Sequence, residues 1–195
     1  MKNDVNIILE IINQKKNLFR KDKVYKMQMI KYTILFFILL SSTLIGKFLS
    51  KKYVYRLEEL EEMKNALNIL KTKIKFIYEP IPEVFEEIAK NTNKNISKIF
   101  TLAKEKMQEE SASIAWEKSI DEVACNMKDE DKKILKTLSK LLGQTDTEGQ
   151  ISQIEVTENF LENQIKEAII LRQKNEKLYT RLGTIMGLTI VIVLV

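Results

Sequence analysis

The sequence predicts an all-α protein in which a six-helix bundle lies between an N-terminal and a C-terminal transmembrane helix. Two apolar runs stand near the ends of the chain, at Tyr32 to Gly46 and at Leu182 to Val195. Five glycines and two prolines in 195 residues leave little for β-hairpins, while Glu, Lys, Leu and Ile dominate. Between the two runs, apolar residues recur at helical spacing, and this region is long enough to bury a core of its own.

The first apolar run predicts a transmembrane helix over residues 29–50. Tyr32 to Gly46 makes about 22 Å of helix, which spans a ~30 Å hydrocarbon core only if the helix continues through Leu49 while Lys47 extends to the interface. The alternative is a secretory signal peptide. Gly46 to Ser50 makes a poor cleavage site, and Lys51 and Lys52 follow at once, so a permanent anchor is favoured.

The second run predicts a transmembrane helix over residues 182–195. It makes about 21 Å of helix, or about 27 Å counted from Leu178 with Arg181 extending to the interface. Gly183 and Gly187 have the GxxxG spacing, which leaves bare backbone one turn apart and lets another transmembrane helix approach closely. The same spacing also arises by chance, so the pair predicts helix packing or is incidental.

Most of the net charge of +5 belongs to an N-terminal extension, residues 1–28. This segment holds seven Lys and Arg against three acids, which leaves 25 basic and 24 acidic residues in the rest of the chain. Met29 lies directly before the apolar run, so we expect translation to begin there or at Met27. The alternative is a genuine arm, in which a short apolar helix precedes a lipid-binding basic cluster.

Basic residues flank the middle segment, residues 51–181, at both ends, and no charged side chain follows the second run. The positive-inside rule therefore predicts a cytoplasmic bundle in the cell membrane. A genuine basic arm at residues 15–26 would weaken this expectation, because its charges lie on the other side of the first span. The flanking residues are Lys51, Lys52, Arg56, Lys174, Lys177 and Arg181.

The first bundle helix has the clearest pattern, a single apolar stripe that ends before Pro80 and Pro82. A short second helix follows from Val84 to Ala89, and a third runs from Ile96 to Met107. The first stripe comprises Leu57, Leu60, Met63, Leu67, Leu70, Ile74 and Ile77.

A fourth helix is capped by Ser111 or Ser113, and its inward residues are mainly Ile114, Trp116, Ile120, Val123 and Ala124. Lys128 to Asp131 is expected to be a charged turn. The fifth helix spans Ile134 to Leu142, and Gly143 is placed to supply a left-handed C-terminal cap.

Thr145 to Glu148 matches the capping box S/T-x-x-E and starts the sixth helix, with Asp146 as a competing N-cap. The apolar stripe of this helix runs from Ile151 to Ile169. No proline interrupts the helix before the second apolar run, so it can continue into the bilayer.

No enzyme chemistry is visible. Histidine is absent, Cys125 is the single cysteine and is interpreted as a structural thiol, and no glycine-rich phosphate loop occurs. Acidic runs such as Asp129 to Asp131 are interpreted as solvated surface. We therefore expect no catalytic residue, metal, cofactor or small-molecule substrate. Nucleic-acid binding is not expected, because acids dilute the Lys and Arg and no aromatics interleave with them.

From Met29 to Val195 the chain resembles the stage III sporulation protein AB family of endospore-forming Firmicutes. The similarity covers the opening membrane helix, Leu57 to Tyr78, Ala115 to Glu117, and Leu138 to Gln150 (LSKLLGQTDTEGQ). No motif of the family covers residues 1–28. The most specific pattern consists of Leu142, Gly143, Gln144, Asp146 and Gln150.

This resemblance implies a non-catalytic platform in the channel complex between mother cell and forespore, with a domain like the F-type platform protein of type II secretion and type IV pili. Its expected partners are the membrane around the forespore, a separate motor ATPase (stage III sporulation protein AA) and other stage III membrane components. Leu142, Gly143, Asp146 and Gln150 are expected to form the corner between the fifth and sixth helices, or a docking site. The alternative function is a general membrane-anchored scaffold or tether unrelated to sporulation.

Overall fold

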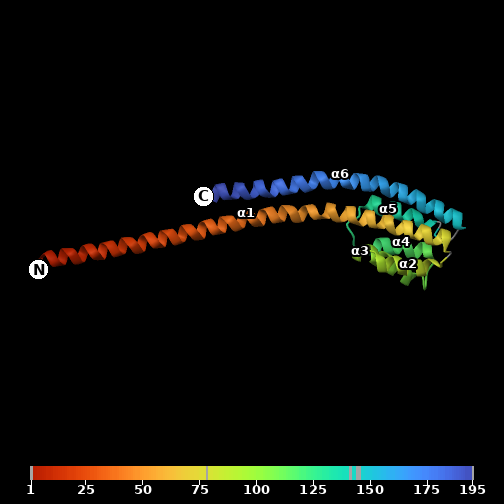
Figure 1. Ribbon diagram of the computed structural model, residues 1–195, viewed down its shortest axis with the longest axis horizontal. Coiled ribbons are helices and arrows are strands. Elements are labelled where there is room, and N and C mark those ends of the chain that lie inside the picture. The colour runs from red at the N-terminus through yellow and green to blue at the C-terminus, as the bar shows by residue number, and fades with distance from the viewer. Residues whose placement is uncertain (1, 78, 141, 144–145, 195) are drawn as a thin grey trace. The chain divides into compact units, whose positions relative to one another are not determined.

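The computed structural model describes residues 2–77, 79–140, 142–143 and 146–194; side chains are described from Lys15 onward, except at 17–19, 22 and 24. These residues form six α-helices and one 3₁₀ helix, without a β-strand among them (Figure 1). The all-α prediction is confirmed. The elements are α1 (Lys2–Phe76), α2 (Ile81–Asn91), α3 (Lys94–Lys106), α4 (Ala112–Glu122), α5 (Asp129–Thr137), η1 (Leu138–Lys140) and α6 (Thr147–Leu194).

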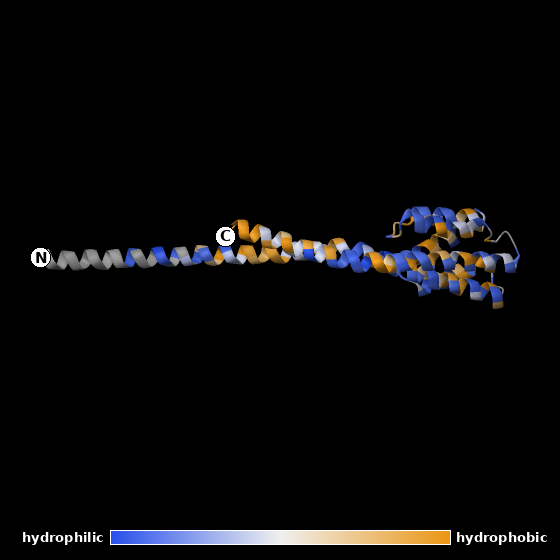
Figure 2. Ribbon diagram, turned by 90° about the horizontal axis from the view of Figure 1, so that it is seen from above, coloured by the Kyte–Doolittle hydropathy of each residue, from blue (hydrophilic) through white to orange (hydrophobic). Residues whose placement is uncertain are grey.

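The chain divides into two compact units. One, here called the hairpin unit, comprises Met1–Phe48 and Tyr179–Val195; the other, the bundle unit, is Leu49–Leu178. Both α1 and α6 contribute residues to each unit. By length and composition, α1 from Tyr25 onward and α6 are each able to cross a membrane, and Figure 2 shows the last turns of α6 as predominantly hydrophobic.

The core of the bundle unit lies between the second part of α1, the first part of α6 and the short helices α2 to α5 (Figure 1). Its centre is an aromatic cluster in which the Phe85 and Phe100 rings meet edge to face, 5.0 Å apart, and Trp116 contacts both. The indole N–H of Trp116 donates to the carbonyl oxygen of Leu135 at 2.8 Å, so this large side chain is buried without an unmet donor.

The apolar stripe of α1 is buried from Leu57 through Ile74, as its spacing predicts. The prediction that Ile77 belongs to this buried stripe is wrong, because its side chain is 55% exposed. The α-helix ends at Phe76, and Pro80 then starts α2 in a new direction, so the last residue of the pattern has left the helical face.

Ser111 is the N-cap of α4, since its Oγ accepts from the N–H of Ile114 at 3.5 Å. With this start, Ala115, Trp116, Ser119 and Ile120 face the core. The prediction that Ile114 and Ala124 face mainly inward is wrong. Ile114 is 49% exposed, and Ala124 is exposed as well. A helix of three turns has few residues from which to read its phase, and the burial of Trp116 sets it here.

Candidate functional site

Within the hairpin unit, α1 and α6 approach each other at glycines. A Cβ atom on Gly183 would lie 2.7 Å from the carbonyl oxygen of Ser42, and one on Gly46 would clash with the carbonyl oxygen of Tyr179. Both contacts would be closer than real Cβ atoms allow, so only glycine at these two positions lets the two backbones lie this close. At Gly187 a Cβ would meet the Leu39 side chain at 3.0 Å. The helix that packs on Gly183 and Gly187 is therefore the first apolar helix of the same chain.

A hydrogen bond joins the two helices at this crossing. The hydroxyl of Ser42 donates to the carbonyl oxygen of Gly183 at 2.7 Å. Sequence reasoning missed Ser42 and Gly46. These two small residues are four positions apart on α1, and this small-xxx-small spacing is the signal that could have found them.

A tight corner joins η1 to α6. Leu142 is buried in the core, and Gly143 has a left-handed backbone with φ of 69°. The Gly143 N–H donates to Oε1 of Gln150 at 3.3 Å, and Oδ1 of Asp146 accepts from the N–H of Gly149 at 3.0 Å. The structure thus brings Leu142, Gly143, Asp146 and Gln150 together, with Asp146 immediately before the first residue of α6. Leu141, Gln144 and Thr145 lie outside the described residues, and with them the first member of the expected capping box.

We expect Gly143→Ala to destabilise the bundle by about 1–2 kcal/mol, because an L-residue is strained in the left-handed region. The added Cβ would make ordinary contacts, 3.4 Å from the Ala112 Cβ and 3.5 Å from Ile81 Cδ1, so space is not the obstacle. Chemical denaturation of the full chain in detergent, followed by Trp116 fluorescence, measures the loss. Gly143→Asn should lose less, because Asn tolerates this backbone; equal losses for Ala and Asn would contradict a conformational cause.

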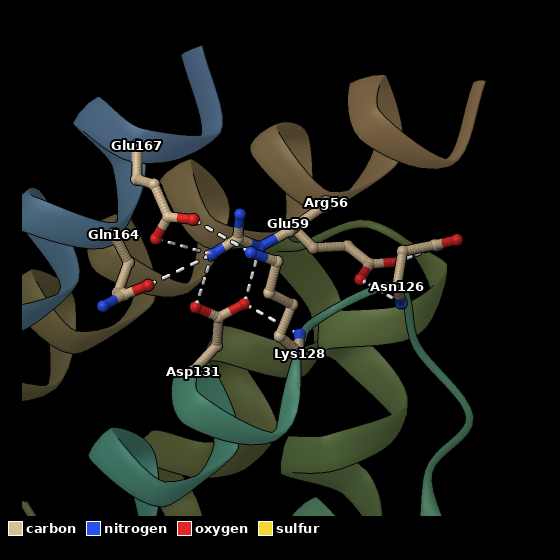
Figure 3. Close-up of polar contacts among 7 residues, drawn as sticks. All are labelled: Arg56, Glu59, Asn126, Lys128, Asp131, Gln164 and Glu167. Atoms are coloured by element: carbon tan, nitrogen blue, oxygen red, sulfur yellow. Dashed lines mark hydrogen bonds and ion pairs between the residues drawn. The ribbon is translucent and has the colours of Figure 1, made fainter. Parts of the chain in front are cut away.

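The most tightly organised polar site is a buried ion pair between α1 and α5 (Figure 3). Arg56 donates from Nε to Asp131 Oδ2 at 2.8 Å and from Nη2 to Asp131 Oδ1 at 2.9 Å. Their side chains are 4% and 0% exposed. From α6, Gln164 Oε1 accepts from Arg56 Nη2 at 3.1 Å, and Glu167 lies 3.8 Å from the same atom. Three helices that are far apart in sequence are therefore held at one guanidinium.

Asp131 also fixes the start of α5. The backbone N–H of Lys128 donates to its Oδ2 at 2.8 Å, and the Lys128 ammonium reaches Glu167 on α6 at 2.9 Å (Figure 3). The interpretation of Asp131 as solvated surface is wrong, and the expected charged turn is the first turn of a helix. The Arg56 guanidinium, counted above among the flanking charges, is buried in this pair.

Next to this pair, one carboxylate joins the start of α3 and the loop before α5 to α1. Glu59, nearly fully buried, accepts from the Asn95 side chain at 2.7 Å. It also accepts from the backbone N–H of Asn126 at 2.6 Å and from the Asn126 side chain at 2.7 Å. The first turn of α3 and the loop before α5 are thus held by the same side chain.

Cys125 is half-buried against the core, and burial raises the pKa of its thiol above the ordinary value. A thiol that is harder to deprotonate is a poorer nucleophile. The environment of Cys125 is therefore that of a packing residue.

Comparison with known proteins gives consistent results. The sequence model of the family described as stage III sporulation protein AB matches residues 31–195. The stage III sporulation protein AB of Bacillus subtilis (strain 168) is 27% identical over 162 residues, 81% of this chain and 95% of that protein. A solved structure titled stage III sporulation protein AB (SpoIIIAB) shares the fold, with a TM-score of 0.54 at 24% identity, over 60% of this chain and 94% of that one.

Proposed function

Because the chain belongs to the stage III sporulation protein AB family, we propose that it is a non-catalytic membrane platform of the sporulation channel that seats a separate motor ATPase. The observation that carries the proposal is the extent of the family match, which includes both apolar segments and the whole bundle unit. The partner ATPase is the stage III sporulation protein AA, and other stage III membrane components complete the assembly.

The two long helices support a role as a seat. Helix α1 carries the longest buried stripe of the core, and α6 adds Ile154, Leu161 and Ala168. The same two helices are long and apolar enough to cross a membrane. No separate linker segment stands between the apolar stretches and the bundle helices within α1 or α6. A protein bound to the bundle would therefore be held by helices that enter the membrane directly.

The charge distribution supports a bundle on the cytoplasmic side, in the mother-cell membrane around the forespore. Lys51 and Lys52 after the first apolar segment are exposed, as are Lys174, Lys177 and Arg181 before the second. These five exposed charges support the cytoplasmic orientation, and Arg56, which is buried in its ion pair, is not needed for it.

The state of the buried carboxylates supports a non-catalytic role. Asp131 is fully engaged by Arg56 and the Lys128 backbone, and Glu59 accepts three hydrogen bonds. Among the described residues, no group of three or more His, Cys, Asp or Glu is placed to hold a metal ion. These groups hold elements of the bundle together, which suits a contact surface.

We also propose that Leu142, Gly143, Asp146 and Gln150 form a structural corner and do not dock a partner. Leu142 is buried, Gly143 pairs with Gln150, and Asp146 caps α6, so each is used within the chain.

The full chain, in detergent or nanodiscs, is expected to bind the stage III sporulation protein AA in isothermal titration calorimetry. Gly143→Asn, which keeps the corner, should bind with unchanged affinity. No detectable heat with both partners folded would contradict the proposal. In cells, deletion should arrest spores after engulfment and leave vegetative growth normal, whereas a vegetative defect would favour a general scaffold.

A further inference from the structure

We propose that four exposed lysines on α1 and α6 bind the headgroups of anionic phospholipids in the leaflet from which the bundle extends. The four residues, here called the juxtamembrane lysines, are Lys51, Lys52, Lys174 and Lys177. The inference rests on the membrane insertion that is part of the proposed function, and it adds a lipid preference to that function.

The juxtamembrane lysines lie on the stretches of α1 and α6 that lead into the apolar segments. Lys51 follows Gly46 by five residues within α1, and Lys177 precedes Leu182 by five residues within α6. Both helices are uninterrupted there, so five residues make about one and a half turns. An extended lysine side chain covers this distance and reaches the phosphates of a bilayer whose hydrocarbon core ends at the apolar run.

The two pairs of lysines lie toward the same end of the bundle unit. Arg56 on α1 contacts Gln164 on α6 at 3.1 Å. Further along α1, Lys64 contacts Glu162, which comes earlier in α6, so the two helices run antiparallel. The residues before Arg56 in α1 and those after Gln164 in α6 therefore extend in the same direction, and all four juxtamembrane lysines are among them.

The chain does not neutralise these four charges. None of the four lysines forms an ion pair with a carboxylate among the described residues. Lys52 lies over the ring of Tyr53, with its Nζ 5.1 Å from the ring centroid. The neighbouring acid in α6, Glu176, pairs with Arg172 at 3.6 Å, and α1 carries no acid from residue 23 through residue 57. A positive charge that the chain leaves unmatched is available to an external anion.

The position of the four lysines selects lipid as that anion. A lipid phosphate is held at the level where these side chains end, and the potential of an anionic leaflet attracts basic residues within a Debye length of its surface. Clusters of four or more Lys or Arg beside a membrane helix are typical of binding to anionic lipid. The choline group of phosphatidylcholine offsets its phosphate, so the attraction favours a lipid with net negative charge, such as phosphatidylglycerol.

Spin-labelled lipids in nanodiscs that hold the full chain test the proposal. Electron paramagnetic resonance measures the fraction of labelled lipid that is immobilised at the protein, and the ratio of phosphatidylglycerol to phosphatidylcholine in this fraction gives the anionic preference. A Lys-to-Gln change at all four positions should lower this ratio about threefold or more, because each basic residue near the surface adds to the attraction. A Lys-to-Arg change at all four should leave the ratio unchanged, because the charge is kept.

A matched control removes the same number of charges elsewhere in the bundle unit. Its lysines are exposed, form no ion pair among the described residues and lie away from the stretches that lead into the apolar segments; they are Lys75, Lys98, Lys133 and Lys140. Lys75 also matches Lys52 in lying over a neighbouring aromatic ring, with its Nζ 5.3 Å from the centroid of Phe76. A Lys-to-Gln change at these four positions should leave the ratio unchanged.

A ratio that stays the same when the juxtamembrane lysines become Gln would overturn the proposal, because any preference would then come from basic residues elsewhere in the chain. Equal losses in the juxtamembrane and control variants would also overturn it, because they would show an effect of net charge alone. Trp116 emission checks that the bundle is folded in each variant.

The result is separable from the proposed function. A chain that stays in vesicles after alkaline carbonate extraction but shows no anionic preference would overturn this inference alone. If carbonate extracted the chain, membrane insertion and the proposed function would fail first.

Discussion

Asp131→Ala is expected to destabilise the bundle by about 3–5 kcal/mol, because it leaves the Arg56 guanidinium buried without its counter-charge. Asp131 accepts two hydrogen bonds from Arg56 and a third from the Lys128 backbone, so the first turn of α5 loosens at the same time. Denaturant unfolding of the full chain in detergent measures the loss. Trp116, the single tryptophan, reports on it directly because its N–H donates to α5 at Leu135.

Asp121→Ala is the matched control for this experiment. Asp121 pairs with Lys136 at 2.6 Å, but its side chain is 59% exposed. The same substitution should therefore change stability far less, because exposed ion pairs contribute little. Replacing both members of the buried pair by apolar residues, Arg56→Met with Asp131→Leu, should recover most of the loss. If Asp121→Ala and Asp131→Ala had similar effects, the buried pair would not have the role assigned to it.

The second large effect is expected at the helix crossing of the hairpin unit. Gly46→Ala should weaken the packing of α1 on α6 by about 1–3 kcal/mol, because its Cβ meets the backbone carbonyl of Tyr179, which cannot move aside as a side chain can. Nitroxide labels at Leu40 and Leu188, both exposed, report the separation by pulsed electron paramagnetic resonance in a Cys125→Ala background. The distance distribution should broaden and shift to longer values.

Gly187→Ala is the control for the crossing. Its Cβ would meet Leu39 Cδ1 at 3.0 Å and Ser42 Cβ at 3.1 Å, both side-chain atoms, and a rotamer change at Leu39 relieves the closer contact. The label distances should therefore change less than in Gly46→Ala. The reverse order would show that the helices do not cross at Gly46 and Gly183.

Features set by local periodicity and local backbone chemistry could be predicted from the sequence. The stripe from Leu57 to Ile74 is buried because its spacing alone defines one helical face. The left-handed Gly143 was predictable because few other residues adopt that conformation at a helix end. The sequence offers two adjacent residues, Thr145 and Asp146, as the N-cap of α6. In the structure Asp146 accepts from the backbone N–H of Gly149.

Features set by partners distant in sequence could not be predicted. Arg56 and Asp131 are 75 positions apart, and nothing in the local sequence distinguishes Asp131 from Asp129 and Glu130, the two exposed acids before it. The continuity of α1 is a different case. No proline or glycine stands between Lys47 and Phe76, so one uninterrupted helix could have been inferred in place of a separate span and bundle helix.

The carboxylate of Glu59 makes the start of α3 and the loop before α5 interdependent. Because the side-chain amides of Asn95 and Asn126 both donate to Oε1 of Glu59, replacing either by an aliphatic residue removes one of the two hydrogen bonds to this buried oxygen. A change in one segment is therefore felt by the other, although 31 positions separate the two asparagines. We therefore expect substitutions at Glu59, Asn95 and Asn126 to be tolerated only when they occur together.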